Sequence, residues 1–272
     1  MQDNNYNDWS VRTTDKQPKK AFEKQYVFVC EGENTECFYF NGLCDNKDGL
    51  GIKRLINVIC YKRPEGIRSH SHPKCLVRQA DEIAGTGLSN FNIETDYIVF
   101  VFDLDIYCQK PNSYKGYENI LNTLRGKRYK SILGLTNPNF ELFLLLHSPD
   151  SYTNIIQANE QLLIAPKKTK THLSEKLFKQ HFKYDSKTCD RVKYLAIDAN
   201  IAIEQESAFL NQDLTTNTAL KNLTSTVGKC VQEIINDTPT NVYGGERAKT
   251  SKPTRKSKSC CPSHRKKSLR KP

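Results

Sequence analysis

Two groups of acidic residues directly follow the two most hydrophobic runs of the chain. The run QYVFVC at 25–30 leads into Glu31, with Glu36 five residues later. The run DYIVFVF at 96–102 leads into Asp103 and Asp105. Carboxylates that crowd at one place cannot all stay ionised unless a cation neutralises them. Hard oxygen ligands of this kind suit Mg²⁺ or Mn²⁺, so these acids are candidate metal ligands.

Each acidic group has an ordinary explanation when it is taken alone. A DxD sequence after a strand often only starts a polar loop, and an acid such as Glu36 in the first turn of a helix can simply complement the helix dipole. The occurrence of both groups after the two most hydrophobic strands favours a metal site. The expected ligands are Glu31, Glu36, Asp103 and Asp105, with Glu33 as a further candidate.

A parallel sheet is needed to bring these acids together. Strands are predicted at 25–30, 54–61, 96–102 and 131–135, and helices at 35–45, 72–84, 114–125 and 139–147. Four strand-then-helix units predict an α/β fold in which helices flank a parallel sheet. Right-handed crossovers place the carboxyl ends of all strands at one edge, and such sheets bind ligands where the strand order switches. If the first and third strands are neighbours, Glu31 lies beside Asp103 and Asp105.

The chain divides into four segments of different character. Residues 1–23 are polar and unpatterned, which predicts a disordered N-terminal segment, and residues 24–149 form the α/β domain. Residues 150–243 show no strand pattern; we expect a helical region beside the sheet, with helices at 154–163, 173–182, 192–209 and 226–235. Residues 244–272 have no apolar periodicity and form a predicted disordered basic tail.

The net charge of +11 is concentrated in the basic tail. Residues 244–272 contain eleven Lys and Arg against the single acid Glu246, a net of +10, which leaves +1 for residues 1–243. Such a tail either adds non-specific, salt-sensitive attraction to nucleic acid or only keeps the chain soluble. No run approaches the roughly 20 apolar residues of a membrane span, and no secretory signal is visible. With ten scattered cysteines and no CxxC pair, we predict a protein of the reducing cytoplasm without membrane association.

Three segments of the chain resemble the RloB-like family of Toprim-domain proteins, which is related to the OLD-type Toprim nucleases. These segments are VCEGENTECFYF at 29–40, VFVFDLD at 99–105 and TNPNFELFLLLH at 136–147. The resemblance implies a Toprim-like sheet and a metal-dependent nuclease of bacterial anti-phage defence. It would hydrolyse phosphodiester bonds of DNA or RNA, tRNA included. Asp103 and Asp105 would hold Mg²⁺ or Mn²⁺, and Glu31 would act as general base or as a ligand of a second ion.

Further residues of the resembling segments have two interpretations each. Glu141 begins the helix after the fourth strand, so it either joins the catalytic edge or complements the helix dipole. His147 ends an apolar helix, which is more typical of a packed or capping histidine than of a catalytic one. Some Toprim nucleases use a lysine to stabilise the transition state, and Lys187, Lys168 and Lys170 are the weak candidates for that role.

A second function stays open, that of a non-catalytic nucleic-acid-binding or sensor subunit of a defence complex that keeps the Toprim shape. The chain contains no GxxxxGK[ST] phosphate-binding loop, so a separate ATPase is the predicted partner. His70 and His72 with Cys75 match no zinc spacing and are interpreted as a polar loop before a helix.

Overall fold

The computed structural model describes residues 23–62, 72–87, 90–108, 114–165, 171–240 and 242–245. Nearly all of the predicted disordered segment 1–23 and of the basic tail 244–272 lies outside the described residues, and so do His70, Lys168 and Lys170. Within the described ranges, no helix is both long enough and apolar enough to span a bilayer.

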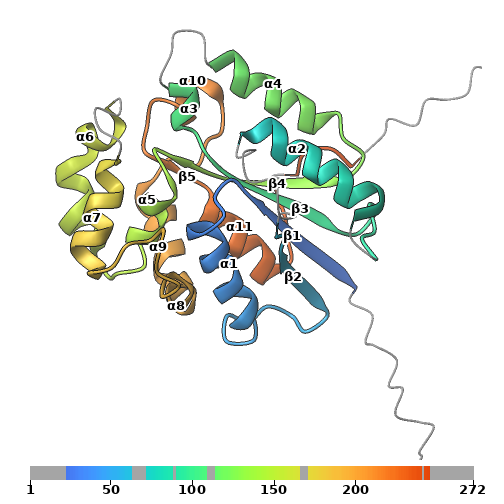
Figure 1. Ribbon diagram of the computed structural model, residues 1–272, viewed down its shortest axis with the longest axis horizontal. Helices are drawn as coiled ribbons and strands as arrows, with labels where there is room; N and C mark the ends of the chain where they lie inside the picture. The colour runs from blue at the N-terminus through green and yellow to red at the C-terminus, as the bar shows by residue number, and fades with distance from the viewer. Residues whose placement is uncertain are drawn as a thin grey trace, which may run out of the picture.

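A five-stranded sheet forms the centre of the fold, in the order β2-β1-β3-β4-β5 (Figure 1). The strands are β1 (Lys24–Cys30), β2 (Ile56–Cys60), β3 (Tyr97–Asp103), β4 (Lys130–Asn137) and β5 (Thr224–Ser225). β1 to β4 are parallel, and β5 pairs antiparallel with the end of β4. The predicted parallel sheet is confirmed. Its strand order switches between β1 and β3, where open α/β sheets bind ligands.

The continuous apolar sequence of β1 follows from burial on both of its faces. Tyr26 and Phe28 belong to the hydrophobic cluster on one face of the sheet, and Val27 and Val29 belong to the cluster on the other. Alternate side chains of a strand point to opposite faces, so the part of β1 that is covered on both sides, residues 26–30, is apolar throughout. The same holds for β3, in which every residue from Tyr97 to Phe102 is buried.

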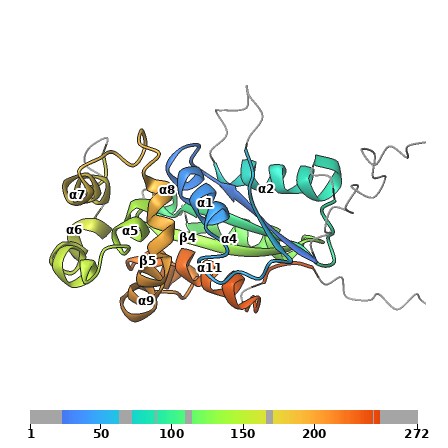
Figure 2. The ribbon, with the colours of Figure 1, turned by 90° about the horizontal axis from the view of Figure 1, so that it is seen from below.

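Helices cover both faces of the sheet (Figures 1 and 2). α1 (Thr35–Asp45) and α11 (Val227–Asn236) pack on one face, and α2 (Pro73–Glu82) and α4 (Tyr114–Arg125) pack on the other. The short helix α3 (Asp105–Cys108) follows β3 at once. The other helices are α5 (Phe140–Leu145), α6 (Glu160–Ile164), α7 (Leu173–Phe182), α8 (Val192–Leu195), α9 (Ala199–Phe209) and α10 (Thr216–Ala219).

The region after residue 149 meets the sheet in a different way from its prediction. It contributes a strand, since β5 pairs its two residues with Thr136 and Asn137. Two residues are too few to leave a sequence pattern, and their pairing is decided by tertiary contact. α11 is also not beside the sheet: it packs directly on β4 and shares a hydrophobic cluster with α1. Helices α6 and α7 do lie beside the sheet (Figure 1).

Two predicted helices of this region are interrupted. The helix expected at 192–209 consists of α8, a 3₁₀ turn (Ala196–Asp198) and α9. The helix expected at 154–163 consists of a π turn (Tyr152–Ile156), a 3₁₀ turn (Gln157–Asn159) and α6. Apolar spacing over one turn is similar for these helix types, so the sequence predicts a helix there but not its hydrogen-bonding pattern.

His147 is part of the core on the α1 face. Its side chain is 3% exposed, and its ring packs edge-on against Tyr39 and Phe143. Nδ1 lies 3.1 Å from the carbonyl oxygen of Leu144, and Nε2 lies 3.1 Å from the hydroxyl of Tyr39. A neutral ring that donates from Nδ1 and accepts at Nε2 satisfies both contacts. The interpretation of His147 as a packed histidine therefore agrees with its surroundings.

Burial of His147 makes the fold sensitive to acid. Desolvation lowers the pKa of His147 from 6.5 to about 4. Between these values the unfolded chain binds a proton that the folded chain does not, so stability falls as the pH falls through this window. The loss amounts to roughly 3 kcal/mol by pH 4. Urea unfolding at pH 5 and pH 7 should show this dependence weakened in His147→Gln and retained in His181→Gln, a change at an exposed histidine.

Candidate metal centre

The carboxyl ends of β1 and β3 bring Glu31 and Asp103 into contact. The backbone N–H of Glu31 donates to the carbonyl oxygen of Val101 at 2.8 Å, which extends the β1–β3 pairing one residue beyond β1. The Glu31 side chain reaches the neighbouring strand, where Oε2 accepts a hydrogen bond from the backbone N–H of Asp103 at 3.0 Å. The two acids lie together because their strands are neighbours in the sheet.

Asp103 is held between two neighbouring strands. Its Oδ1 accepts a hydrogen bond from the hydroxyl of Thr136 on β4 at 2.6 Å, and the two residues are paired in register. Burial, and after it the charges of Glu31 and Glu36, raise the pKa of Asp103 well above its usual value, against the opposing effect of the Thr136 hydroxyl. The position thus disfavours a bare negative charge, which a bound cation would stabilise.

Glu36 folds back from α1 toward the end of β1. Its Oε1 accepts a hydrogen bond from the backbone N–H of Gly32 at 3.0 Å. A Cβ atom at position 32 would collide with the Glu36 carboxylate, so this close approach requires glycine. Burial, and after it the charges of Glu141 and Glu31, raise the pKa of Glu36 to about 8. Without a cation, the carboxyl group of Glu36 is therefore largely protonated at neutral pH.

Asp105 faces a histidine that the sequence did not single out. Asp105 opens α3, and its Oδ2 lies 3.6 Å from Nε2 of His172. His172 is the N-cap residue of α7 and forms a capping box with Glu175, whose Oε1 accepts from the His172 backbone N–H at 3.2 Å. Its Nε2 is buried and has no hydrogen-bond partner among the described residues. The ring is thus oriented by the start of α7 toward the acid.

Glu141 and Lys187 complete the site from the region around α5 and α7. Glu141 is buried in the first turn of α5, and its Oε1 accepts from the hydroxyl of Ser186 at 2.7 Å. Burial raises the pKa of Glu141, and the Ser186 hydroxyl opposes that effect. The Lys187 Nζ lies 2.9 Å from Oε2 of Glu175, and its carbonyl oxygen accepts from Asn34 Nδ2 at 2.9 Å. Although burial opposes it, the contact with Glu175 raises the pKa of Lys187.

The acids described above, together with His172 and Lys187, line one open pocket of about 300 Å³ at the carboxyl edge of the sheet. The acidic residues that line it are Glu31, Glu33, Glu36, Asp103, Asp105, Glu141 and Glu175. Lys187 and His172 also line it. The lining therefore carries a large excess of carboxylates. Such a pocket attracts cations and repels phosphate, unless cations are bound in it.

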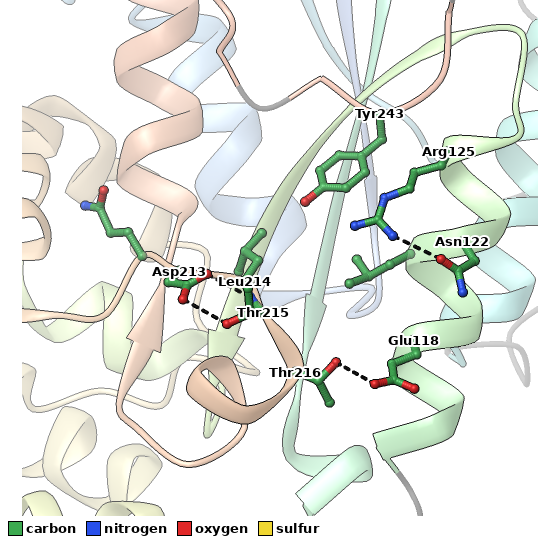
Figure 3. Close-up of a pocket in the computed structure, with 10 residues that line it drawn as sticks. Glu118, Asn122, Arg125, Asp213, Leu214, Thr215, Thr216 and Tyr243 are labelled. Carbon is green, nitrogen blue, oxygen red and sulfur yellow. Dashed lines mark hydrogen bonds between the residues drawn. The ribbon is translucent and has the colours of Figure 1, made fainter.

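A larger cavity of about 610 Å³ has a different character (Figure 3). It lies between α4 and residues 212–216, and its polar side chains pair with one another: Arg125 donates to Asn122 at 3.0 Å, and Thr216 donates to Glu118 at 3.1 Å. The cavity shares no lining residue with the acidic pocket. Its mixed charges do not select one class of ligand, so the acidic pocket is the candidate site.

Comparison with protein families identifies the family of the chain. The model of the family described as RloB-like protein matches residues 26–234, well over half of the 272 residues. The chain belongs to the RloB-like protein family. No curated protein and no solved structure matches it. In this RloB-like protein, the matched segment begins in β1, ends in α11 and contains every residue that lines the acidic pocket.

The carboxylates of the acidic pocket in this RloB-like protein are suitable metal ligands, but their oxygen atoms do not converge on one point. Among the described residues, only three cysteines place one ligand atom each within 4.8 Å of one another. The carboxylates instead accept hydrogen bonds from the protein, as Glu31, Glu36 and Asp103 do. Oxygen donors and mutually raised pKa values fit a hard cation. Binding such a cation would exchange those hydrogen bonds for coordination.

The remaining candidate residues of this RloB-like protein lie in three different places. Glu33, Glu141 and Lys187 line the pocket, whereas His147 is buried in the core. His72 accepts from the backbone N–H of Lys74 at 3.1 Å as the N-cap of α2, in agreement with its interpretation as part of a loop before a helix.

Sequence reasoning missed His172 and Glu175. Their signal in the sequence is an acid three residues after a capping residue at the start of a helix, and this pattern indicates only a helix start. That this start faces the ends of β1 and β3 is decided by the packing of α7.

Proposed function

We propose that this RloB-like protein is a metal-dependent nuclease that hydrolyses phosphodiester bonds of DNA or RNA at the acidic pocket. The observation that carries the proposal is the contact between Glu31 and Asp103 at the switch in strand order, with Asp105, Glu36 and Glu141 around the same pocket. The resemblance to Toprim nucleases involves the same acids. It extends the proposal to a role in bacterial anti-phage defence with a separate ATPase as partner.

Each acid has a role that its position supports. Asp103 and Asp105 hold Mg²⁺ or Mn²⁺, since they come from the end of β3 and the start of α3 in one pocket. Such an ion, when bound, would supply Lewis acidity toward the phosphoryl oxygen and would stabilise the leaving oxygen. Glu31 accepts the proton of the attacking water or serves as a ligand of a second ion, together with Glu36 and Glu33.

Lys187 and His172 are the groups of the lining that can contact the substrate or the transition state as cations. Lys187 is half-exposed and reaches the pocket from the segment before α8. Its ion pair with Glu175 keeps it protonated and limits its reach, and a phosphate in the pocket would compete for it. His172 lies with its Nε2 3.6 Å from Oδ2 of Asp105, so its ring faces the same acid that is proposed to hold the ion.

The proposal is tested by incubating the full chain with plasmid DNA, single-stranded DNA and total tRNA. We expect cleavage of at least one substrate with Mg²⁺ or Mn²⁺, and none with a chelator. Asp105→Asn should lower the rate by about 10²-fold or more, because it removes a charged ligand of the ion. Asp190→Asn is the matched control, since Asp190 is exposed, lies outside the lining of the acidic pocket and pairs with Lys193 at the surface.

The alternative of a non-catalytic binding subunit predicts a different result. Nucleic acid would then bind without cleavage under every metal tested, and Asp105→Asn would change neither measurement. That outcome would contradict the proposed nuclease. Cleavage that persists unchanged in Asp105→Asn or in the presence of the chelator would contradict the assignment of the acidic pocket.

A further inference from the structure

Three cysteines from three elements meet on the α1 face of the sheet. Cys30 is the last residue of β1, Cys60 is the last residue of β2, and Cys37 lies in the first turn of α1. Their sulfur atoms all lie within 4.8 Å of one another. The meeting follows from the register, because Phe28 of β1 pairs with Cys60 and Cys30 lies two residues further on the same face.

The surroundings of the three cysteines suit a protected but reachable ion. Cys30 is 4% exposed, whereas Cys37 and Cys60 are only partly buried, so the group opens toward solvent on one side. The thiols form hydrogen bonds with one another, and the Cys37 thiol also donates to the carbonyl oxygen of Gly32 at 3.4 Å. All eight described cysteines are present as thiols rather than disulfides.

Three sulfur ligands select a different class of metal from the acidic pocket. Thiolates prefer soft or borderline ions such as Zn²⁺ and Cu⁺, and they bind Mg²⁺ poorly. We propose that Cys30, Cys37 and Cys60 form a second metal site, which binds a thiophilic d¹⁰ cation such as Zn²⁺ or Cu⁺ through three sulfur atoms. On binding, each thiol releases its proton to solvent and no electron is transferred.

The cysteine site and the acidic pocket use separate ligand atoms. Cys30 precedes Glu31 directly, but the carboxylate of Glu31 turns to the backbone of Asp103. The proposed metal site on the cysteines can therefore be confirmed or refuted independently of the nuclease activity proposed above.

The test uses Cd²⁺ as probe, because thiolate-to-cadmium charge transfer produces an absorption band in the near ultraviolet. The full chain carries Cys260→Ser and Cys261→Ser, since an adjacent cysteine pair could bind Cd²⁺ by itself. Titration of the reduced, metal-free protein, followed at this band, should reach its end point at one Cd²⁺ per chain. Cu⁺ kept reduced, or Zn²⁺ in excess, should displace Cd²⁺, and the concentration that each needs ranks the two ions, whereas Mg²⁺ in large excess should not displace it.

Variants then assign the ligands. Cys37→Ser and Cys60→Ser should each weaken Cd²⁺ binding at least ~10-fold, since loss of even an outer-sphere partner costs about 10- to 100-fold. Cys189→Ser is the matched control, because Cys189 is also partly buried but lies outside the group. Circular dichroism and the unfolding temperature establish that each variant is folded.

X-ray absorption at the cadmium edge of the loaded protein counts the sulfur neighbours without relying on the cysteine-to-serine ligand variants. Three sulfur neighbours support the proposal. A shell made only of oxygen and nitrogen would overturn it, and so would the absence of a charge-transfer band. Equal Cd²⁺ affinity in Cys37→Ser, Cys60→Ser and Cys189→Ser would also overturn it.

Discussion

Replacing Asp103 with asparagine is expected to reduce metal-dependent cleavage by roughly 10³-fold and, at the same time, to stabilise the metal-free protein. The rate falls because the substitution removes a charged ligand from the centre of the proposed site. The fold survives because the amide oxygen of the new side chain can still accept the hydrogen bond that Thr136 donates to Asp103. Cleavage assays and thermal unfolding of the same preparations measure the two effects.

The stabilisation has a defined dependence on pH. Burial and the charges of Glu31 and Glu36 raise the pKa of Asp103 above its unfolded value of 3.8. As the pH rises above that value, the unfolded chain loses its proton before the folded chain does, so the wild type loses stability that the Asp103→Asn variant keeps. The advantage of Asp103→Asn should be absent near pH 3 and should grow as the pH rises toward neutrality.

Mg²⁺ should make the wild type more stable than Asp103→Asn. The ion stabilises the wild type by binding only the folded chain, and it should leave the unfolding temperature of Asp103→Asn nearly unchanged. Asp190→Asn serves again as control and should respond to Mg²⁺ like the wild type. If Asp103→Asn cleaves at a rate within a few-fold of the wild type, Asp103 is not a ligand of the catalytic ion.

The second large effect is expected at Glu206, which joins α9 to β5 and α11. Glu206 is fully buried. It accepts hydrogen bonds from the Ser225 hydroxyl and from the backbone N–H groups of Gly228 and Lys229, the latter two at 2.9 and 2.7 Å. These N–H groups belong to the first turn of α11 and have no partner within the helix. A buried carboxylate thus caps α11 from a different helix.

Glu206→Ala is expected to cost about 3–5 kcal/mol of unfolding free energy. It leaves two backbone donors and a hydroxyl buried without partners and creates a cavity. Glu206→Gln keeps the volume and one accepting oxygen but places an amide N–H₂ group near donors, so its cost should be intermediate. Urea unfolding checks the order wild type, Gln, Ala.

Glu204 provides the matched control for Glu206. It lies on the same helix and is exposed, so Glu204→Ala should change the free energy of unfolding by no more than about 0.5 kcal/mol. Equal losses for Glu204→Ala and Glu206→Ala would contradict the role of Glu206. The effect also bears on the site, because Ser225 pairs in register with Thr136, which holds Asp103.

The sheet and its order were accessible from the sequence to different degrees. β1 and β3 are continuous apolar runs because both of their faces are buried, and this pattern is visible in the sequence alone. The predicted meeting of the acids required β1 and β3 to be neighbours. Only the observed pairing of Cys30 with Val101 shows that they are. β5 left no pattern, since a strand of two residues is shorter than one alternation.

The sequence by itself determined which carboxylates could act, because their positions directly after the strands place them at the carboxyl edge once the strands are parallel. It gave no indication that Cys30, Cys37 and Cys60 would meet, because they come from three different elements. Tertiary structure alone decided the other side of the pocket, where the packing of α7 brings His172 and Glu175 to Asp105 and Lys187. The physical reason is distance along the chain: local spacing fixes the direction of a side chain within its element, whereas contacts between remote elements depend on how their buried faces pack.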